Sequence, residues 1–238
     1  MMARRMVFDE RVASQYEAWY EGPQGRRADT LEKASLESLL RRFSEARSVL
    51  EVGCGTGHFV RWFEQQELMA VGLDISAPML RKARAGSGLN GTPLVQADAY
   101  RLPFADGAFD LAAFITTIEF LEASPEALAE AVRVASRGLL LGVLNRWSAL
   151  ALRRRLVGLF RHNVYKTAHF YAVGELRRLL RSLVSDVSRK VTKGHPASGG
   201  RSDLTWHTTL FPGWLPWQQA RLPWGGFIAM ALALPEAG

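Results

Sequence analysis

Cysteine is almost absent from this sequence, and its absence narrows the class of protein. Cys54 is the single cysteine among 238 residues, so the chain has no internal disulfide framework. We therefore expect a protein of a reducing compartment, the cytoplasm. Nothing around Cys54 indicates an activated thiolate, and one thiol is too few for chemistry that requires several cysteines.

Long hydrophobic runs are missing as well. The longest, FIAMALAL at 227–234, is too short to span a bilayer as a helix. Residues 1–12 are basic but lack the apolar segment that a secretory signal needs. With 48% hydrophobic residues, the chain can form one α/β domain with a full core. We expect a soluble protein.

Acidic residues are scarce in one part of the chain only. Residues 137–201 contain 14 Lys and Arg against two Asp and Glu, whereas residues 1–136 contain 15 against 19. The basic character therefore belongs to one segment, and any electrostatic role should lie there.

The first two thirds of the chain alternate between strand and helix patterns. Two amphipathic helices are predicted first, at 8–21 and at about 29–43. Continuous apolar runs then predict strands near 47–52, 68–73, 93–97, 109–115 and 138–144. Helical patterns lie between them, at about 57–66, 77–85 and 125–136. This order predicts an α/β fold with a doubly wound, mostly parallel sheet that binds ligands at the carboxyl ends of its strands.

The pattern changes after residue 145. Basic amphipathic helices are predicted at 146–161 and 173–184, followed by strands at 185–192 and 226–234 around a loop and a tryptophan-rich stretch. We expect a single domain over 1–238 with a seven-stranded sheet. Its parts are N-terminal helices (1–45), a core (46–145), a helical cap insertion (146–184) and C-terminal strands (185–238).

A glycine-rich turn follows the first predicted strand. VLEVGCGTG at 49–57 places glycines at 53, 55 and 57, and glycine lets a ligand approach the backbone closely. Alone, this turn is compatible with a dinucleotide fingerprint, a phosphate loop or a tight structural turn. His58 and Phe59 follow it, where a phosphate loop needs Lys and Ser or Thr and a dinucleotide fingerprint favours a small residue at 58.

Acidic residues accompany the ends of three successive strands. Glu51 lies in the first strand, Asp74 ends the second and Asp98 follows the third. Asp74 can accept hydrogen bonds from a ribose diol, and three carboxylates would repel a pyrophosphate but attract a sulfonium nucleoside with an ammonium group. The alternative is that Asp74 and Asp98 are ordinary helix N-caps.

Together these motifs resemble a known family. VLEVGCGTG, VGLDIS, QADAYRLPF and FDLAAFITTIEFLE, in this order, resemble class I S-adenosylmethionine-dependent methyltransferases of the small-molecule, type 11-like branch. The resemblance covers residues 8–185. It implies S-adenosylmethionine as cofactor, S-adenosylhomocysteine as product and a small-molecule acceptor.

The resemblance also implies roles for individual residues around the cofactor's methionine and ribose ends. The backbone at Gly53, Cys54 and Gly55 would meet the methionine end, and Glu51 would orient its ammonium group. Asp74 would bind the ribose diol.

At the adenine end, the resemblance implies a slot lined by Ile75 and Met79, with Asp98 accepting from the amino group and the Ala99 N–H facing a ring nitrogen. Met79 has an ordinary alternative as core filler.

Beside the reactive methyl, the resemblance places Ile115 and Thr116, and it makes Tyr16 the candidate for an N-terminal helix that closes over the cofactor. An equally good alternative is that Tyr16 belongs to a packed amphipathic face.

The acceptor pocket has four candidates, which should lie near strand ends or in the cap: Glu119, Asn145, His169 and Tyr171. Glu119 could also be a solvated charge, and His169 a surface or capping histidine. We assign no catalytic residue, because methyl transfer requires alignment more than a particular side chain. The histidines lack metal-ligand spacing, so we expect no metal.

The acceptor class follows partly from missing motifs. The chain lacks the Asn/Asp-Pro-Pro-aromatic and Pro-Cys motifs of nucleic-acid methyltransferases, which argues against a nucleic-acid acceptor. The basic segment still leaves an RNA-directed enzyme as an alternative, beside a nucleotide-binding oxidoreductase or a sensing module. The helix at 146–161 can be a packed helix, a lid or a peripheral membrane contact. The sequence leaves the oligomeric state open.

Overall fold

The chain folds around one eight-stranded sheet. We describe it from a computed structural model over residues 8–86, 88–89, 91–148, 168–191, 203–211 and 219–235. The strands are β1 (Ser48–Val52), β2 (Met69–Asp74), β3 (Leu94–Gln96), β4 (Phe109–Ile115), β5 (Ala135–Leu144), β6 (Leu204–Thr209), β7 (Gln219–Ala220) and β8 (Phe227–Ala233). Their order across the sheet is β3-β2-β1-β4-β5-β8-β6-β7.

The first five strands are parallel and the last three are antiparallel to their neighbours. β1 pairs with both β2 and β4, and β8 runs antiparallel between β5 and β6. The predicted α/β class and mostly parallel sheet are therefore confirmed. The strand order reverses between β1 and β4, which is where a doubly wound sheet opens a crevice for a ligand.

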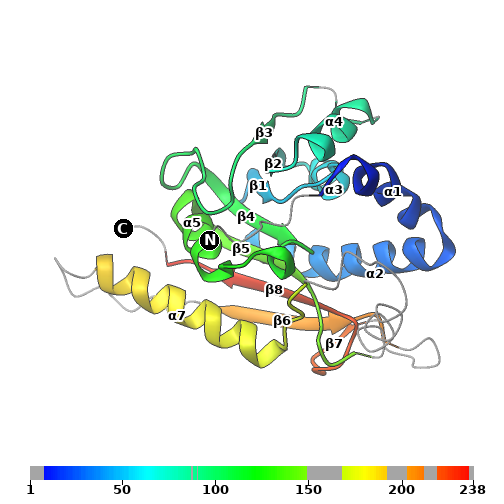
Figure 1. The fold of residues 1–238 in the computed structure, drawn as a ribbon. Coiled ribbons are helices and arrows are strands. Elements are labelled where there is room, and N and C mark those ends of the chain that lie inside the picture. Colours follow the sequence, from blue (N-terminus) through cyan, green and yellow to red (C-terminus); the bar gives the residue numbers. More distant parts are fainter. Residues whose placement is uncertain are drawn as a thin grey trace, which may run out of the picture.

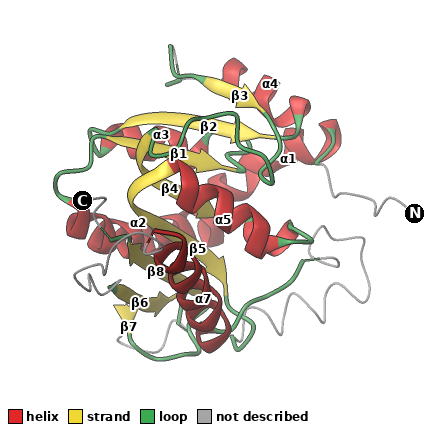
Figure 2. Cartoon of the chain, turned by 90° about the vertical axis from the view of Figure 1, so that its left-hand side faces the viewer, coloured by secondary structure: helices red, strands yellow, loops and turns green. Residues whose placement is uncertain are grey.

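Helices cover both faces of the sheet (Figure 1). They are α1 (Glu10–Glu21), α2 (Pro23–Leu40), α3 (His58–Gln65), α4 (Ala77–Ala85), α5 (Ser124–Val134) and α7 (Val173–Val191), with short 3-10 turns at Arg41–Phe43 and Ile118–Phe120. One buried cluster joins α5 and α7 to the sheet, and a second joins α2, α3 and α4 to its other face. Figure 2 shows α5 and α7 lying side by side. Central strands covered on both faces are mostly apolar, which explains their hydrophobic runs, and Glu51 is a buried polar exception in β1.

Side-chain caps fix the starts of the helices next to the sheet. The Asp9 carboxylate accepts from the Val12 N–H at the start of α1, and the Ser76 hydroxyl accepts from the Met79 N–H at the start of α4. α2 begins at Pro23, earlier than the predicted residue 29, because proline is tolerated in the first turn of a helix.

The structure differs from the sequence prediction mainly after residue 184. The predicted strand at 185–192 is wrong, because α7 continues to Val191. β6 at Leu204–Thr209 and the two-residue β7 were not predicted at those positions, and β7 raises the strand count from seven to eight. The predicted helix at 146–161 lies outside the described residues from 149 onward.

Among the residues that the structure describes, no helix is both long enough and apolar enough to cross a membrane.

Asp110 joins the start of β1 to β4 at the amino-terminal edge of the sheet. Its Oδ2 accepts from the Arg47 and Ser48 N–H groups at 2.8 and 3.0 Å, and its Oδ1 accepts from Arg137 Nε at 3.1 Å. Partial burial raises the pKa of Asp110, but the hydrogen bonds from Arg47, Ser48 and Arg137 outweigh it and lower the pKa below its ordinary value.

We expect Asp110→Asn to lower the free energy of unfolding by about 1–3 kcal/mol near neutral pH, as for a lost charge-assisted hydrogen bond. Because the folded-state pKa is depressed, this stabilisation is present above the unfolded pKa of about 3.9 and is lost as pH falls. Urea titrations across this pH range measure the difference. Asp106→Asn is the control, because Asp106 also pairs with an arginine, Arg133, but is 82% exposed. An equal loss in both variants would contradict the role of Asp110.

Candidate functional site

The candidate site lies at the carboxyl ends of β1, β2 and β4, beside the reversal of strand order. The turn at residues 53–57 leaves β1 and enters α3, and it donates its first hydrogen bonds to β2. The Gly53 and Cys54 N–H groups donate to the Leu73 carbonyl at 2.7 and 2.9 Å. The turn is therefore fixed to the sheet before any ligand is considered.

The three glycines of the turn have positive φ angles, but only one of them faces open space. A Cβ at Gly53 would lie 2.2 Å from Thr117 Cγ2, and one at Gly57 would lie 2.4 Å from Leu89 Cδ1. A Cβ at Gly55, where φ is 55°, would meet nothing within 4 Å. Gly53 and Gly57 are thus needed for packing, whereas Gly55 leaves bare backbone that a ligand can approach.

Asp74, at the end of β2, holds the glycine turn in place. Its Oδ2 accepts from the Gly55 N–H and its Oδ1 from the Ser76 N–H, both at 2.8 Å. The side chain is only 8% exposed. Burial raises the pKa of Asp74, and the backbone donors Ser76, Gly55 and Ile75 oppose that rise. The alternative that Asp74 is a helix N-cap is wrong, because the residue that caps α4 is Ser76.

Glu51 is a buried carboxylate of β1, 2% exposed. Its Oε2 has no hydrogen-bond partner among the described residues. Burial and the neighbouring Asp74 raise the pKa of Glu51 well above its ordinary value, while Arg61 and the Val60 N–H act in the opposite direction. An orphaned oxygen of this kind is the expected acceptor for a cationic donor group from outside the chain.

The end of β4 is strained where it passes the glycine turn. Thr116 has a φ of 50°, which is uncommon for a β-branched residue, and its N–H donates to the Gly142 carbonyl at 2.7 Å. The Thr117 hydroxyl donates to the Gly53 carbonyl at 3.2 Å, so β4 and the turn are joined directly. Ile115 is buried beneath them. Backbone strain of this kind is concentrated at functional sites.

The residues predicted for an adenine slot lie beyond β2 and β3. Ile75 is partly exposed, and its carbonyl accepts from Gln96 Nε2 at 3.2 Å. Asp98 Oδ1 accepts from the Tyr100 N–H at 3.1 Å within a turn that leads to no helix before β4, so Asp98 is not a helix cap either. Ala99 is buried beside it. Met79 is among the most deeply buried side chains, which favours its alternative role as core filler.

The residue Phe8, just before α1, is held at the site side of the sheet by two contacts. The Ser76 hydroxyl donates to the Phe8 carbonyl at 2.5 Å, and the Phe8 ring packs edge-on against Phe120 with centroids 5.1 Å apart. On α1 itself, Tyr16 contacts Tyr20 at a centroid distance of 5.9 Å. Phe8 therefore connects the segment after β2 with the 3-10 turn after β4.

Two polar contacts behind the glycine turn were not predicted from the sequence. His58 Nε2 lies 2.6 Å from Asp29 Oδ1 of α2, and its ring stacks on Tyr20 of α1 at 3.9 Å. Arg61, one turn further along α3, contacts both the glycine turn and Glu17 of α1. The sequence shows His58 and Arg61 as polar residues shortly after the turn. It could not indicate their partners on α1 and α2, which are distant in the sequence.

The four acceptor-pocket candidates lie together at the ends of β4 and β5. The Glu119 carbonyl accepts from the His169 N–H at 2.7 Å, and Glu119 Oε1 accepts from the Leu144 N–H at 2.6 Å. Asn145 forms a parallel bridge with Tyr171, whose hydroxyl lies 2.6 Å from Ser124 Oγ.

These candidates differ in how much of each side chain is available. The Asn145 amide donates to the Pro223 and Gly225 carbonyls at 2.8 and 2.7 Å and accepts from the Trp147 N–H, so its polar atoms are occupied. Glu119 and Tyr171 are buried. His169 is half exposed, and its Nε2 lies 2.7 Å from Glu175 Oε1.

No group of three or more His, Cys, Asp or Glu side chains in the described part of the chain is placed to hold a metal ion.

Comparison with known proteins shows which proteins this chain is similar to. A family model for a methyltransferase domain matches residues 50–141. An uncharacterised protein of Mycobacterium tuberculosis is 31% identical over 202 residues, which cover 82% of this chain. The chain spans 66% of that relative's length. A malonyl-[acyl-carrier protein] O-methyltransferase of Pectobacterium atrosepticum is 34% identical over 90 residues, covering 38% of this chain and 35% of its own.

Among solved structures, a Thermotoga maritima protein described as an S-adenosylmethionine-dependent methyltransferase and possible histamine N-methyltransferase superposes with a TM-score of 0.71. It is 27% identical, and the match covers 94% of this chain and 96% of that protein. Magnesium protoporphyrin IX methyltransferase from Synechocystis, with S-adenosylhomocysteine bound, shares the fold with a TM-score of 0.60 at 14% identity, over 93% of this chain and 94% of its own.

We expect Glu51→Gln to stabilise the ligand-free protein. Because the folded-state pKa of Glu51 is raised, its contribution to stability falls as pH rises above the unfolded value of about 4.3. The amide does not ionise, so the variant should gain about 1–3 kcal/mol of unfolding free energy near neutral pH and nothing in acid. Chemical denaturation at several pH values measures the gain. Glu122→Gln, at an exposed carboxylate, is the control. A destabilised Glu51→Gln protein at neutral pH would contradict the assignment of Glu51 as an uncompensated buried acid.

Proposed function

We propose that the chain is a class I S-adenosylmethionine-dependent methyltransferase that moves a methyl group to O, N or C of a small organic acceptor. The observation that carries the proposal is the convergence of the orphaned Glu51 oxygen, the bare backbone of Gly55 and the Asp74 carboxylate at the reversal of strand order. Each of these features suits one part of this cofactor.

The chemistry of the three groups fits S-adenosylmethionine as a cationic amino-acid nucleoside. Glu51 offers a carboxylate oxygen to an ammonium group in a buried setting, where such a hydrogen bond is strong. Gly55 offers space, since a side chain there would enter the volume that a ligand needs. Asp74 accepts from the Gly55 N–H on one oxygen and from the Ser76 N–H on the other, and a carboxylate has acceptor capacity beyond these for a ribose diol.

We assign the remaining cofactor contacts by the same reasoning. Ile75, Asp98 and Ala99 lie where β2 and β3 end, and they would receive the adenine ring. Tyr16 would close the methionine side from α1, with Gly53 and Cys54 providing backbone below it. We give Met79 no direct contact, because its side chain is buried in the core.

When bound, S-adenosylmethionine supplies a methyl group activated by a sulfonium. The task of this chain is then to hold the acceptor in line and to exclude water. Ile115 and Thr116 end β4 beside the glycine turn and would border the reacting methyl. Phe8 and Phe120 contact each other near the end of β4 and would shield the methyl from solvent.

On the acceptor side, the available groups favour orientation of the acceptor over a dedicated base. Glu119 and Asn145 hold the strand ends together and would shape the wall. His169 presents a half-exposed ring beside Tyr171 and Glu175 and is the best placed of the four candidates to meet an acceptor.

The relatives suggest two acceptor chemistries to test first. The Thermotoga protein is described as a possible histamine N-methyltransferase, and the Pectobacterium enzyme is a malonyl-[acyl-carrier protein] O-methyltransferase, so amine and malonyl acceptors come first. We expect S-adenosylhomocysteine to form only when an acceptor of one class is supplied, as measured by chromatography of the cofactor products. Tight binding of NAD and no binding of S-adenosylmethionine in calorimetry would overturn the proposal.

We expect Gly55→Ala to reduce S-adenosylmethionine affinity by at least tenfold, because the added methyl enters the space left open at the turn. The matched control is Gly91→Ala, where φ is 89° and a Cβ also meets nothing within 4 Å. Both variants carry a similar backbone cost of about 1 kcal/mol, but Gly91 lies in the loop before β3. Calorimetric titration separates them, and equal affinity in both variants would place the ligand elsewhere.

A further inference from the structure

Arg61 contacts two parts of the chain that flank the proposed cofactor site. It lies in the first turn of α3, directly after the glycine turn. Its Nη1 donates to the Thr56 carbonyl at 3.1 Å, and its Nη2 donates to Glu17 Oε1 of α1 at 3.1 Å. Its Cδ lies 3.2 Å from the position of a Cβ on Gly88, so the stem of the side chain is packed as well. One guanidinium therefore connects the turn to α1.

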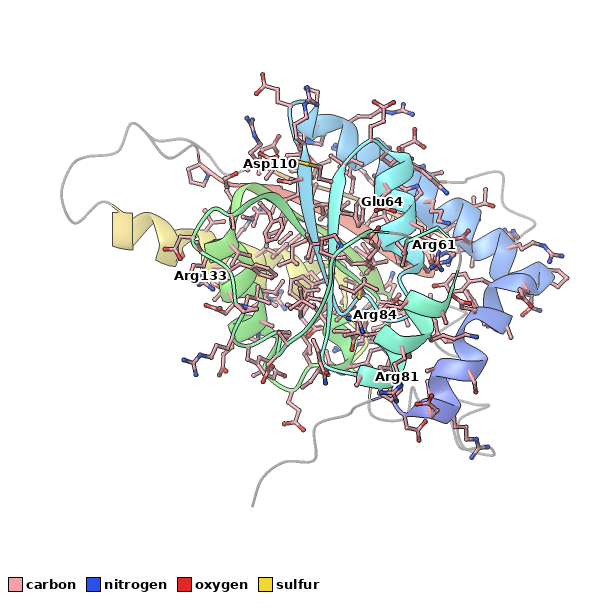
Figure 3. The ribbon with its side chains drawn as sticks, turned by 90° about the horizontal axis from the view of Figure 1, so that it is seen from above. Arg61, Glu64, Arg81, Arg84, Asp110 and Arg133 are labelled. Atoms are coloured by element: carbon pink, nitrogen blue, oxygen red, sulfur yellow. The ribbon has the colours of Figure 1, made fainter. Side chains whose placement is uncertain are left out.

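A second arginine provides a natural comparison. Arg81 of α4 pairs with Glu10 at the other end of α1 at 2.8 Å. Figure 3 shows Arg61 and Arg81 on the same side of the molecule, whereas Arg133 and Asp110 lie on the other. The side chain of Arg81 is 59% exposed and that of Arg61 only 21%. Exposed ion pairs contribute little to stability, so Arg81 should matter much less than Arg61.

Arg61 also acts on the buried acid of the site. Glu51 accepts a hydrogen bond from the Val60 N–H, and the charged groups that act on it are Asp74 of β2 and Arg61, which follows Val60 in α3. Burial and Asp74 raise the pKa of Glu51, and Arg61 is the positive side chain that counters them. Arg61 thus favours the ionised carboxylate, which is the form that can accept from an ammonium group.

We infer that Arg61 is a positioning residue that keeps Glu51 ready to bind the cofactor's ammonium group and fastens α1 to the glycine turn. The inference rests on the proposed function, because it concerns the same cofactor site. Arg61 itself acts through Thr56, Glu17 and Glu51. α1 carries Tyr16, so the contact between Arg61 and Glu17 also decides how firmly that helix stays over the site.

Two independent effects follow from this arrangement. Loss of the positive charge should make Glu51 hold its proton to higher pH, which weakens ammonium binding on the acidic side. Loss of the link to α1, whose Tyr16 would close over the methionine end, should let S-adenosylmethionine leave faster at any pH. A purely structural arginine would instead weaken all ligands of the site alike.

The experiment compares four variants of the full chain: Arg61→Gln, Arg61→Lys, Glu17→Gln and Arg81→Gln. Dissociation constants are measured by calorimetry between about pH 5.5 and about pH 6.8, where the ligand's amino group remains mostly charged. S-adenosylmethionine is one probe. The other is 5′-methylthioadenosine, which keeps the adenosine part and lacks the ammonium group. Stopped-flow displacement gives the release rates, and thermal unfolding confirms that each variant is folded.

We expect Arg61→Gln to weaken S-adenosylmethionine binding by about tenfold or more at the acidic end, with the loss shrinking as pH rises. Methylthioadenosine should change by less than about threefold. Arg61→Lys should restore the pH profile but not the slow release, because lysine keeps the charge and lacks the two-pronged geometry. Glu17→Gln should speed release without moving the pH profile, and Arg81→Gln should behave as the parent protein.

The inference is overturned if Arg61→Gln and Arg81→Gln bind S-adenosylmethionine equally, or if both probes weaken together in Arg61→Gln. The former would mean that Arg61 does not act on the site, and the latter that it only supports the fold. A parent protein that binds neither probe overturns the proposed function itself, and the inference with it. Failure of the inference alone leaves binding by the parent protein intact.

Discussion

The Asp74 carboxylate is the constraint on which the rest of the site depends. It accepts from the Gly55 N–H with one oxygen and from the Ser76 N–H with the other, and so it joins the turn after β1 to the start of α4. Without this bridge, two loops from separate strands would each have to find their own conformation. With it, the bare backbone at Gly55 and the helix that follows β2 are fixed relative to each other at the carboxyl ends of β1 and β2.

Two buried carboxylates lie near the same strand ends, and both are unfavourable for the stability of the ligand-free protein. Glu51 and Asp74 are both buried, and burial raises both pKa values. A site selected only for stability would replace these acids with apolar residues. The loss of stability that these two acids cause is understandable if the site binds a cationic ligand, because the ligand then supplies the positive charge that pairs with them. The strained Thr116 and the orphaned oxygen of Glu51 belong to the same pattern, in which a few positions give up stability to fit a ligand.

The sheet and the glycine turn could be predicted from the sequence because each depends on residues that are close together in the chain. The apolar runs of β1 and β4 and the glycines at 53 and 55 can be interpreted without knowing what lies opposite them. The strand predicted at 185–192 failed for the converse reason: SDVSRKV continues the helix that begins at Val173, and its branched residues gave a misleading strand pattern. Arg61 could not be identified either, because its partners Thr56 and Glu17 define its role and they lie on different elements.

β8 occupies an unusual place in the order of the sheet. It lies between β5 and β6, so residues from near 230 are hydrogen-bonded on both sides within the interior of the sheet. During synthesis β5 must therefore wait for almost ninety further residues before its free edge is covered. An uncovered apolar edge invites association with other chains, so the emerging polypeptide is most exposed to aggregation during this interval. The strands β1 to β5 can pair with one another before β8 is synthesised. Folding is therefore expected to begin in this half of the sheet, which carries the glycine turn.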